Sequence, residues 1–239
     1  MSILALHGVA KSYGALKVTD DVSLAVEAGE TLGILGPNGA GKTTLFNLIC
    51  GDVRVDTGRI AFEGRDITAL PPHRRCRLGI GRTYQIPQPF GQMSVFENLV
   101  AAACFGGGQR ERDAWHTAHE VLSHTGLHKH ANQHAGSLTL LNRKRLELAR
   151  ALATRPKLLL LDEIAGGLTE HEARELVAEL ARIKAAGITM VWIEHVVHAL
   201  LAIADRLFVI NFGQSIANGV PRAVMANPEV QRVYLGVEA

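Results

Sequence analysis

The residues best suited to chemistry lie between positions 36 and 43, where the chain reads Gly-Pro-Asn-Gly-Ala-Gly-Lys-Thr. Two glycines that enclose four residues, followed by Lys-Thr, form the phosphate-binding P-loop pattern. Glycine lets backbone N–H groups approach a polyphosphate, and the dipole of a following helix favours its negative charge. We expect Lys42 to reach the β- and γ-phosphates and the Thr43 hydroxyl to ligate Mg²⁺. The residues expected to bind the nucleoside triphosphate are Gly36, Pro37, Asn38, Gly39, Ala40, Gly41, Lys42, Thr43 and Thr44.

The residues on either side of this loop supply the elements that would position it. Thr31–Leu35 precedes the loop and is apolar enough to form a buried strand. Residues 44–50 can continue as a helix, with Gly51 as its expected stop. A strand, a glycine-rich loop and a helix in this order are the context that makes the pattern a nucleotide-binding site.

Polar residues follow two apolar runs in the second half of the chain. Asp162 and Glu163 follow the run 157–161, and His195 comes shortly after the run 188–193. Because the carboxyl ends of parallel strands meet at one edge of a sheet, we expect these side chains to face the same crevice. Asp162 would hold Mg²⁺ directly or through water, and Glu163 would polarise the water that attacks the γ-phosphate.

Three further side chains complete the expected site. His195 can hydrogen-bond the γ-phosphate, and Gln85 can help to place the water or the metal. Tyr13 could stack on a purine ring, or it could be an ordinary half-buried tyrosine at a strand end. The expected catalytic residues are Lys42, Gln85, Glu163 and His195, and the expected metal ligands are Thr43, Gln85 and Asp162.

The pattern of apolar residues predicts an α/β fold with a mostly parallel sheet and helices on both of its faces. Residues 1–30 favour β-structure, and residues 58–64 favour another strand of the same sheet. Residues 93–153 are mostly helical and form an inserted α lobe, in which Ser94 and Glu97 have capping-box spacing.

Two clusters in the helical lobe have alternative readings. The six histidines could bind a metal, but no Cys or carboxylate falls at zinc-ligand spacing beside them, so we favour a solvated helical face. Arg143–Arg145 could contact nucleic acid, but three charges on an amphipathic helix favour its solvated face. The histidines are His116, His119, His124, His128, His130 and His134.

The composition limits the classes of protein to which this chain can belong. The 239 residues can bury a sizeable core, and a net charge of +2 gives no reason to expect nucleic acid. No apolar run approaches the roughly 20 residues of a membrane span, and the N-terminus lacks a signal-peptide pattern. Three widely spaced cysteines favour reduced core residues in a cytosolic protein.

The P-loop, Gln85, Leu158–Glu163 and His195, in this order and spacing, resemble the ATP-binding cassette (ABC) ATPases over the whole chain. The resemblance implies a P-loop NTPase (RecA-like) core with an N-terminal antiparallel β subdomain and an inserted α-helical subdomain. It also implies a head-to-tail dimer that sandwiches two ATP molecules and drives membrane subunits. In the family, an aromatic residue at the position of Tyr13 stacks on adenine, and the loop contacting the membrane partner begins at the position of Gln85.

The resemblance divides a single ABC ATPase domain, 1–239, into subdomains. The expected parts are an antiparallel β subdomain (1–30 and 58–75), a P-loop core (31–57, 76–92 and 154–217), a helical subdomain (93–153) and a C-terminal tail (218–239).

Shorter motifs resemble the branched-chain amino acid uptake group of this family. They are Arg82–Gln85, Ser94–Leu99, Ile193–His195, Asn227–Val230 and Tyr234–Gly236. The resemblance implies an importer of branched-chain amino acids, amides, urea or another small organic solute. Its partners would be two transmembrane permease subunits, a second ATPase subunit and, indirectly, an extracytoplasmic solute-binding protein, with the chain peripheral on the cytoplasmic face of the inner membrane.

The alternative function is a soluble ABC ATPase without a membrane partner, as in DNA repair or translation, or a binding-only regulatory subunit. A soluble relative would be expected to carry coiled-coil, tandem or nucleic-acid-binding insertions, and this compact cassette has none.

The sequence departs from the family at the signature motif, Leu-Ser-Gly-Gly-Gln, often Leu-Ala-Tyr-Gly-Gln in the subgroup. Here Leu138–Asn142 precedes an expected helix 143–154, and Leu141 replaces the second glycine. A leucine should crowd the phosphate that this glycine normally lets the backbone approach. Nearby, Ile164 replaces the usual proline and Thr169 the usual aspartate or asparagine.

The altered signature leads to a hypothesis about the dimer. The chain would pair with a different ATPase subunit, whose intact signature completes this chain's own P-loop site. The partner's ATP would meet the altered signature. Alternatively, the helix N-terminus at 142–145 suffices and both sites hydrolyse ATP.

Overall fold

The computed structural model describes residues 2–235, which fall into two compact units. One unit combines Met1–Pro72 with Thr189–Ala239, and the other is His73–Ile188. This division does not follow the subdomain boundaries expected from the sequence, which therefore remain a prediction. Of the expected tail motifs, Gly236 lies outside the described residues.

An antiparallel sheet forms much of the first unit, with strand order β2-β1-β4-β5. Alternate residues of β2, Val22, Leu24 and Val26, are buried because successive side chains of a strand point to opposite faces. The predicted β-structure of residues 1–30 and its pairing with the strand near residue 60 are confirmed, although the strands are longer than expected. The strands are β1 (Ser2–Tyr13), β2 (Leu16–Glu27), β4 (Thr57–Phe62) and β5 (Arg65–Asp66).

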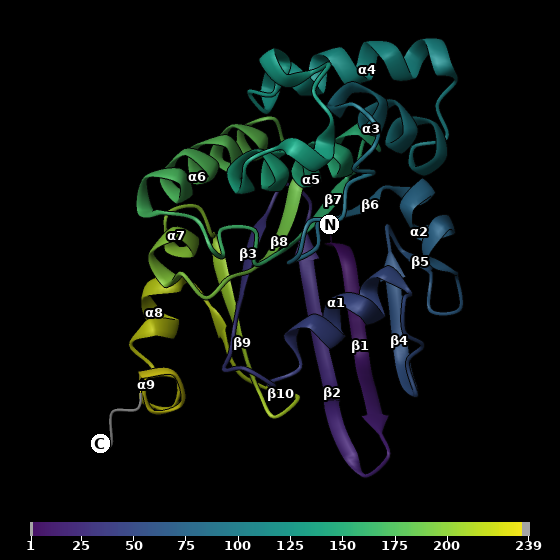
Figure 1. The fold of residues 1–239 in the computed structure, drawn as a ribbon. Helices are drawn as coiled ribbons and strands as arrows, with labels where there is room; N and C mark the ends of the chain where they lie inside the picture. The colour runs from purple at the N-terminus through teal and green to yellow at the C-terminus, as the bar shows by residue number, and fades with distance from the viewer. Residues whose placement is uncertain (1, 236–239) are drawn as a thin grey trace. The chain divides into compact units, whose positions relative to one another are not determined.

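The same unit contains the strand that leads into the P-loop. This strand, β3, pairs in parallel with both β8 and β9, and β10 is antiparallel to β9. Every residue of β3 and β8 is buried, as expected for strands covered on both faces. The elements are β3 (Thr31–Leu35), α1 (Lys42–Cys50), β8 (Thr189–Ile193), α7 (Val197–Leu201), β9 (Arg206–Asn211), β10 (Gln214–Gly219), α8 (Pro221–Met225) and α9 (Pro228–Leu235) (Figure 1).

The second unit contains a parallel strand pair and a helical bundle. Strand β6 pairs with β7, so that Arg82 lies opposite Leu160. All five residues of β7 are buried, in agreement with the apolar run in the sequence. The elements outside the bundle are α2 (Pro72–Leu78), β6 (Ile80–Arg82), β7 (Leu158–Asp162) and α6 (Glu170–Ala185).

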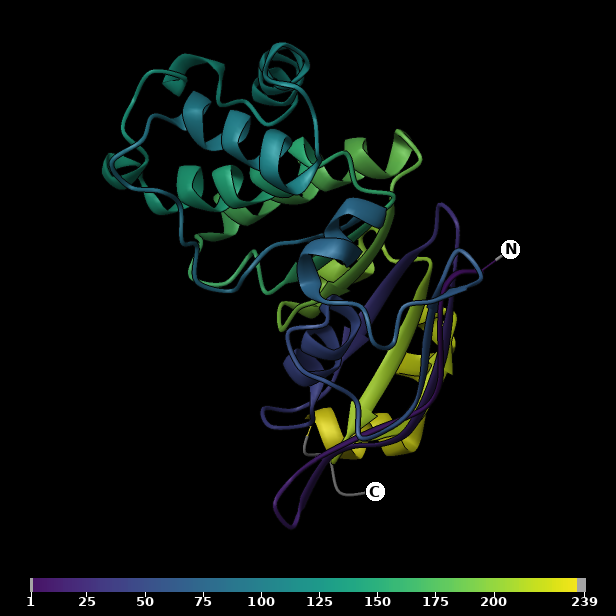
Figure 2. The same cartoon turned by 90° about the vertical axis from the view of Figure 1, so that its right-hand side faces the viewer.

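The bundle joins α3, α4 and α5 around a shared apolar core (Figure 2). Leu99, Val121 and Leu146 contribute to this core from the three helices in turn. The predicted capping box of Ser94 and Glu97 is present at the start of α3. The elements are α3 (Val95–Ala101), the π-helix η1 (Ala102–Gly106), α4 (Glu111–His124), the 3-10 helices η2 (His128–His130) and η3 (Ala135–Ser137), and α5 (Leu140–Ala153).

The start of α5 corrects the expectation from the sequence. The helix begins at Leu140 rather than at residue 143, because Thr139 takes the N-cap position and accepts a hydrogen bond from the backbone N–H of Asn142. The end of the altered signature is therefore the first turn of α5.

Two structural observations bear on metal binding by the histidines and on membrane insertion. Within residues 2–235, no three His, Cys, Asp or Glu side chains gather where they could hold a metal ion. None of the helices in this part of the chain is both long and apolar enough to cross a bilayer.

Candidate nucleotide-binding and hydrolysis residues

The P-loop follows a path that requires glycine at two positions. A Cβ on Gly36 would lie 2.2 Å from the carbonyl oxygen of Ile210, and a Cβ on Gly41 would lie 2.2 Å from that of Val18. Gly41 also has φ +103°, a conformation that side chains rarely adopt. Strands β9 and β2 thus pack directly against the backbone of the loop. The loop is held further by a 3.0 Å hydrogen bond from the N–H of the turn residue Gly213 to the carbonyl of Ala40.

Lys42 lies along the loop, at the start of α1. Its side chain is buried, and Nζ donates to the carbonyls of Gly36 at 2.7 Å and Pro37 at 2.9 Å. No side chain within residues 2–235 caps the N-terminus of α1, and Thr43 is exposed there. A bare backbone loop, a lysine along it and a helix N-terminus together fit a polyphosphate group, as the sequence predicts.

His195 belongs to the same unit as the P-loop. Ile34 of β3 lies opposite Ile193 of the parallel strand β8, so the P-loop and His195 leave the sheet at the same edge. The buried carboxylate of Glu194 accepts a 2.9 Å hydrogen bond from the backbone N–H of His195, which fixes this turn.

Tyr13 lies at the end of β1 with about half of its surface exposed. The Nζ of Lys11 lies 5.6 Å from the centre of its ring. Its proposed stacking on adenine stays a prediction.

Gln85, Asp162 and Glu163 belong to the second unit, and two of them are in direct contact. The Nε2 of Gln85 donates to the Oε2 of Glu163 at 2.5 Å. The buried carboxylate of Asp162 pairs with Arg82 at 3.1 Å, and its backbone N–H donates to the hydroxyl of Thr83 at 3.2 Å. Because these residues and the P-loop belong to different units, their joint action on one nucleotide remains a prediction.

Arg82 contacts one of the predicted metal ligands, Asp162, and no sequence pattern indicates this contact. The pair with Asp162 joins side chains that are 80 residues apart in the chain, and both are almost fully buried. The pairing of β6 with β7 places Arg82 near the carboxylate, and only this register could have revealed the contact.

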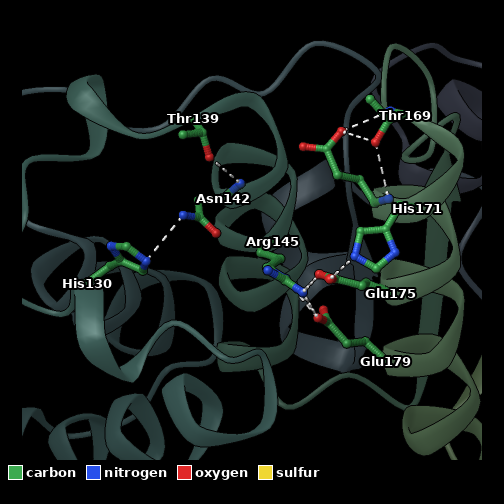
Figure 3. Close-up of polar contacts among 9 residues, drawn as sticks. His130, Thr139, Asn142, Arg145, Thr169, His171, Glu175 and Glu179 are labelled. Atoms are coloured by element: carbon green, nitrogen blue, oxygen red, sulfur yellow. Dashed lines mark hydrogen bonds and ion pairs between the residues drawn. The ribbon is translucent and has the colours of Figure 1, made fainter.

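The altered signature forms the N-terminal turn of α5 (Figure 3). The hydroxyl of Thr139 accepts from the backbone N–H of Asn142 at 3.4 Å, and the side-chain amide of Asn142 lies 3.3 Å from the Nε2 of His130. Leu140 is 45% exposed, and a Cβ on Gly167 would lie 3.3 Å from its Cδ2. An apolar side chain thus lies at this helix end, against the loop that follows Glu163.

The expectation that Arg143–Arg145 form a solvated face is wrong for Lys144 and Arg145. Lys144 is only 4% exposed, and Arg143 donates to the carbonyl of Gly136 at 2.7 Å. Arg145 donates to Glu179 at 2.7 Å and to Glu175 at 2.9 Å, which ties α5 to α6 (Figure 3). Lys144 and Arg145 face inward, and each has polar partners on other elements of the unit.

One carboxylate of the ion pair between α5 and α6 has a raised pKa. Burial raises the pKa of Glu179 above its usual range, and the hydrogen bond from Arg145 opposes this shift. Glu175 also lies 3.2 Å from the imidazole of His171 (Figure 3). These contacts fix the orientation of α5, the helix that carries the altered signature.

The mixed α/β fold and the P-loop geometry define the chain as a P-loop NTPase. The sequence model of the family described as "ABC transporter" matches residues 19–166. A second model, "Branched-chain amino acid ATP-binding cassette transporter", matches residues 214–239.

Curated relatives and solved structures match the chain over nearly its whole length. The lipopolysaccharide export system ATP-binding protein LptB of Haemophilus influenzae is 38% identical, over 99% of this chain and 98% of that protein. The high-affinity branched-chain amino acid transport ATP-binding protein LivG of Salmonella typhimurium is 36% identical, over 98% of each. The structure of the ADP conformation of an ATP-binding cassette of an ABC transporter superposes with a TM-score of 0.88, at 34% identity, and covers 99% of this chain and 100% of that one.

The chain therefore belongs to the ABC transporter family. As such it is an ATPase and the ATP-binding subunit of a transporter, which confirms the class and the fold that the sequence predicts.

Proposed function

We propose that this subunit energises the import of branched-chain amino acids or of a similar small organic solute. The observation that carries this proposal is the match of residues 214–239 to the branched-chain amino acid model. The similarity to LivG supports it, whereas LptB, an export protein, is similar to the same extent. The direction of transport is thus the part of the proposal that most needs an experiment.

Each predicted site residue has a proposed role in hydrolysis. Lys42 and the P-loop backbone would bind the β- and γ-phosphates, and His195 would donate to the γ-phosphate. Thr43, Gln85 and Asp162 offer the oxygen ligands that Mg²⁺ prefers, and the metal would neutralise charge on the phosphate oxygens.

Glu163 would accept the proton of the attacking water. Its carboxylate is held by the hydrogen bond from Gln85, which orients the base before the reaction. Tyr13 would stack on the adenine.

The proposed partners follow from the transporter function. Two transmembrane permease subunits would bind the chain on the cytoplasmic face of the inner membrane, and a solute-binding protein would deliver the solute from outside. Nucleic acid is not a proposed partner.

We further propose that the second ATPase subunit is a different chain. The exposed Leu140 gives this chain's signature an apolar surface unlike the glycine-rich motif of the family. The alternative of a binding-only regulatory subunit or an ABC ATPase outside transport is not proposed, because the chain belongs to the ABC transporter family.

Purification from its natural membrane tests the partners, and a solute assay tests the direction. We expect two polytopic membrane proteins to co-purify with the chain, and the reconstituted complex to accumulate branched-chain amino acids in vesicles in an ATP-dependent manner. Glu163→Gln should stabilise an ATP-bound dimer, and the matched change at the exposed Glu170, Glu170→Gln, should not. Purification without membrane proteins would contradict the transporter role, and ATP-dependent efflux would contradict import.

A further inference from the structure

Lys144 is a buried ammonium group that contacts two of the predicted site residues. It lies in the second turn of α5, and its side chain is 4% exposed. Its Nζ donates to the backbone carbonyl of Gln85 at 2.6 Å and to that of Glu163 at 3.2 Å. One side chain thus joins α5, the loop after β6 and the loop after β7.

A buried lysine is unfavourable unless hydrogen bonds replace the water that its charge has lost. Both carbonyls receive charge-assisted hydrogen bonds, which are stronger than neutral ones. These contacts therefore depend on where the charge of Lys144 lies, and not only on the volume that its side chain fills.

The carbonyl of Glu163 belongs to a backbone in an unfavourable conformation. Glu163 has φ +47°, in the left-handed region that favours glycine. The same carbonyl accepts a second hydrogen bond, 3.1 Å long, from the N–H of Gly166. Two donors thus hold this backbone in the conformation that sets the direction of the carboxylate.

The side chains of the two residues bound by Lys144 also bond to each other. Gln85 donates from Nε2 to the Oε2 of Glu163, so backbone and side-chain contacts close one hydrogen-bonded cluster around the carboxylate. A movement of α5 would therefore act on both residues through Lys144.

We propose that Lys144 is a positioning residue for ATP hydrolysis: its ammonium group holds the backbones of Gln85 and Glu163 and so orients the carboxylate of Glu163. This inference rests on the proposed role of Glu163 as the base. Because α5 begins within the altered signature, Lys144 also couples the position of that helix end to the base.

The test compares Lys144→Met, which keeps an unbranched side chain without the charge, with Lys144→Arg, which keeps the charge. In the assembled ATPase complex we expect Lys144→Met to lower kcat at least about tenfold with little change in KM, because a misplaced base slows chemistry more than binding. Lys144→Arg should recover part of the loss. Lys129→Met, at an exposed lysine of the same unit, is the matched control and should leave kcat unchanged.

A double-variant cycle separates positioning from general destabilisation. In the Glu163→Gln background, Lys144→Met should change the residual rate less than about twofold, because the group that it positions is gone. Equal fold-losses in both backgrounds, or a wild-type kcat in Lys144→Met, would overturn the proposal.

Amide hydrogen exchange on the purified chain supplies a readout that does not depend on activity. We expect faster exchange at the Gly166 N–H in Lys144→Met, and in Lys144→Gln if the Met variant does not fold. Unchanged exchange there would overturn the proposal. Faster exchange in a complex that does not hydrolyse ATP would support the cluster and contradict the proposed function instead.

Discussion

Two helices of this chain begin at segments that the sequence relates to phosphate, and their N-termini are built differently. Before α1, Gly41 stands at the N-cap with φ +103° and brings no side chain. Before α5, Thr139 stands at the N-cap, and its hydroxyl accepts from the N–H of Asn142. The first residue of α5, Leu140, is exposed, whereas the P-loop glycines leave the backbone of α1 bare.

We infer from the comparison that the two helix N-termini are not equally suited to bind phosphate. Both helices have a positive N-terminal end, but at α5 a side chain of the protein itself serves one of the first-turn donors. We infer that the chain keeps its own ATP site and has altered the surface that it would present to the ATP of a partner.

We expect the largest effect, a loss of nucleotide affinity, when a glycine of the P-loop is replaced. Gly36→Ala would place a Cβ 2.2 Å from the carbonyl of Ile210, so the loop must move. We expect the affinity for a fluorescent ATP analogue to fall at least about 100-fold, a loss of ~2.7 kcal/mol. Gly39→Ala is the control, because its φ of +80° is strained but no atom lies within 4 Å of the added Cβ. Equal affinities of the two variants would contradict the role of the close approach.

The second prediction concerns the start of α5, where family residues are returned to the altered signature. The double variant Leu141→Gly with Asn142→Gln removes the branched side chain and returns the family's glutamine. We expect the steady-state ATPase rate of the complex with its partner subunit to rise about twofold, as the second site begins to contribute. The gain should vanish when the partner's catalytic glutamate is replaced. A gain that persists in that background would mean that the change acts on this chain's own site.

The N-cap of α5 predicts a smaller effect, on stability. Thr139→Ala removes the hydroxyl that accepts from the N–H of Asn142, and we expect the free energy of unfolding in urea to fall by about 1 kcal/mol. Thr139→Ser keeps the acceptor and should unfold like the wild type. If the Ala and Ser variants were equally stable, the cap would not hold this helix end.

The smallest expected effect concerns the pH dependence of stability, to which the start of α6 should contribute and the start of α5 should not. Hydrogen bonds from the backbone and side chain of Thr169 lower the pKa of Glu172 at the start of α6. A lowered folded-state pKa gives stability that is present above about pH 4.5 and lost as the pH falls through the folded value. The first turn of α5 has no acidic residue, so its cap should not titrate in this range.

Glu172→Gln tests this difference, because glutamine keeps the capping-box geometry without a titrating group. Unfolding free energies measured between pH 5 and pH 3 should depend less steeply on pH in this variant than in the wild type. If the unfolding free energy depended on pH equally in both proteins, the carboxylate of Glu172 would not contribute to the pH dependence of stability.

Local patterns predicted much of the fold and the separate parts of the site. The P-loop, the buried strands β3, β7 and β8 and the capping box of Ser94 and Glu97 depend on a few neighbouring residues, and the structure contains all of them. The expected start of α5 is three residues late, because the expectation rests on the family signature rather than on the Thr139 cap.

Contacts between distant segments could not be read from the sequence in the same way. Arg82 meets Asp162 only because β6 and β7 pair, and Lys144 reaches Gln85 and Glu163 only because α5 packs near both loops. A charge on a helix does not reveal by itself whether it faces water or a partner, which is why the solvated face expected at Arg143–Arg145 was wrong for Lys144 and Arg145.

We propose that the ATP site of this chain is active and that the site facing its altered signature is not. The most direct test of this claim is the steady-state ATPase rate of the complex with its partner subunit, with each catalytic glutamate replaced by glutamine in turn. We expect Glu163→Gln to remove nearly all activity and the equivalent change in the partner to remove little. Equal losses from the two replacements, or rapid ATP turnover by a purified homodimer of this chain, would contradict the claim.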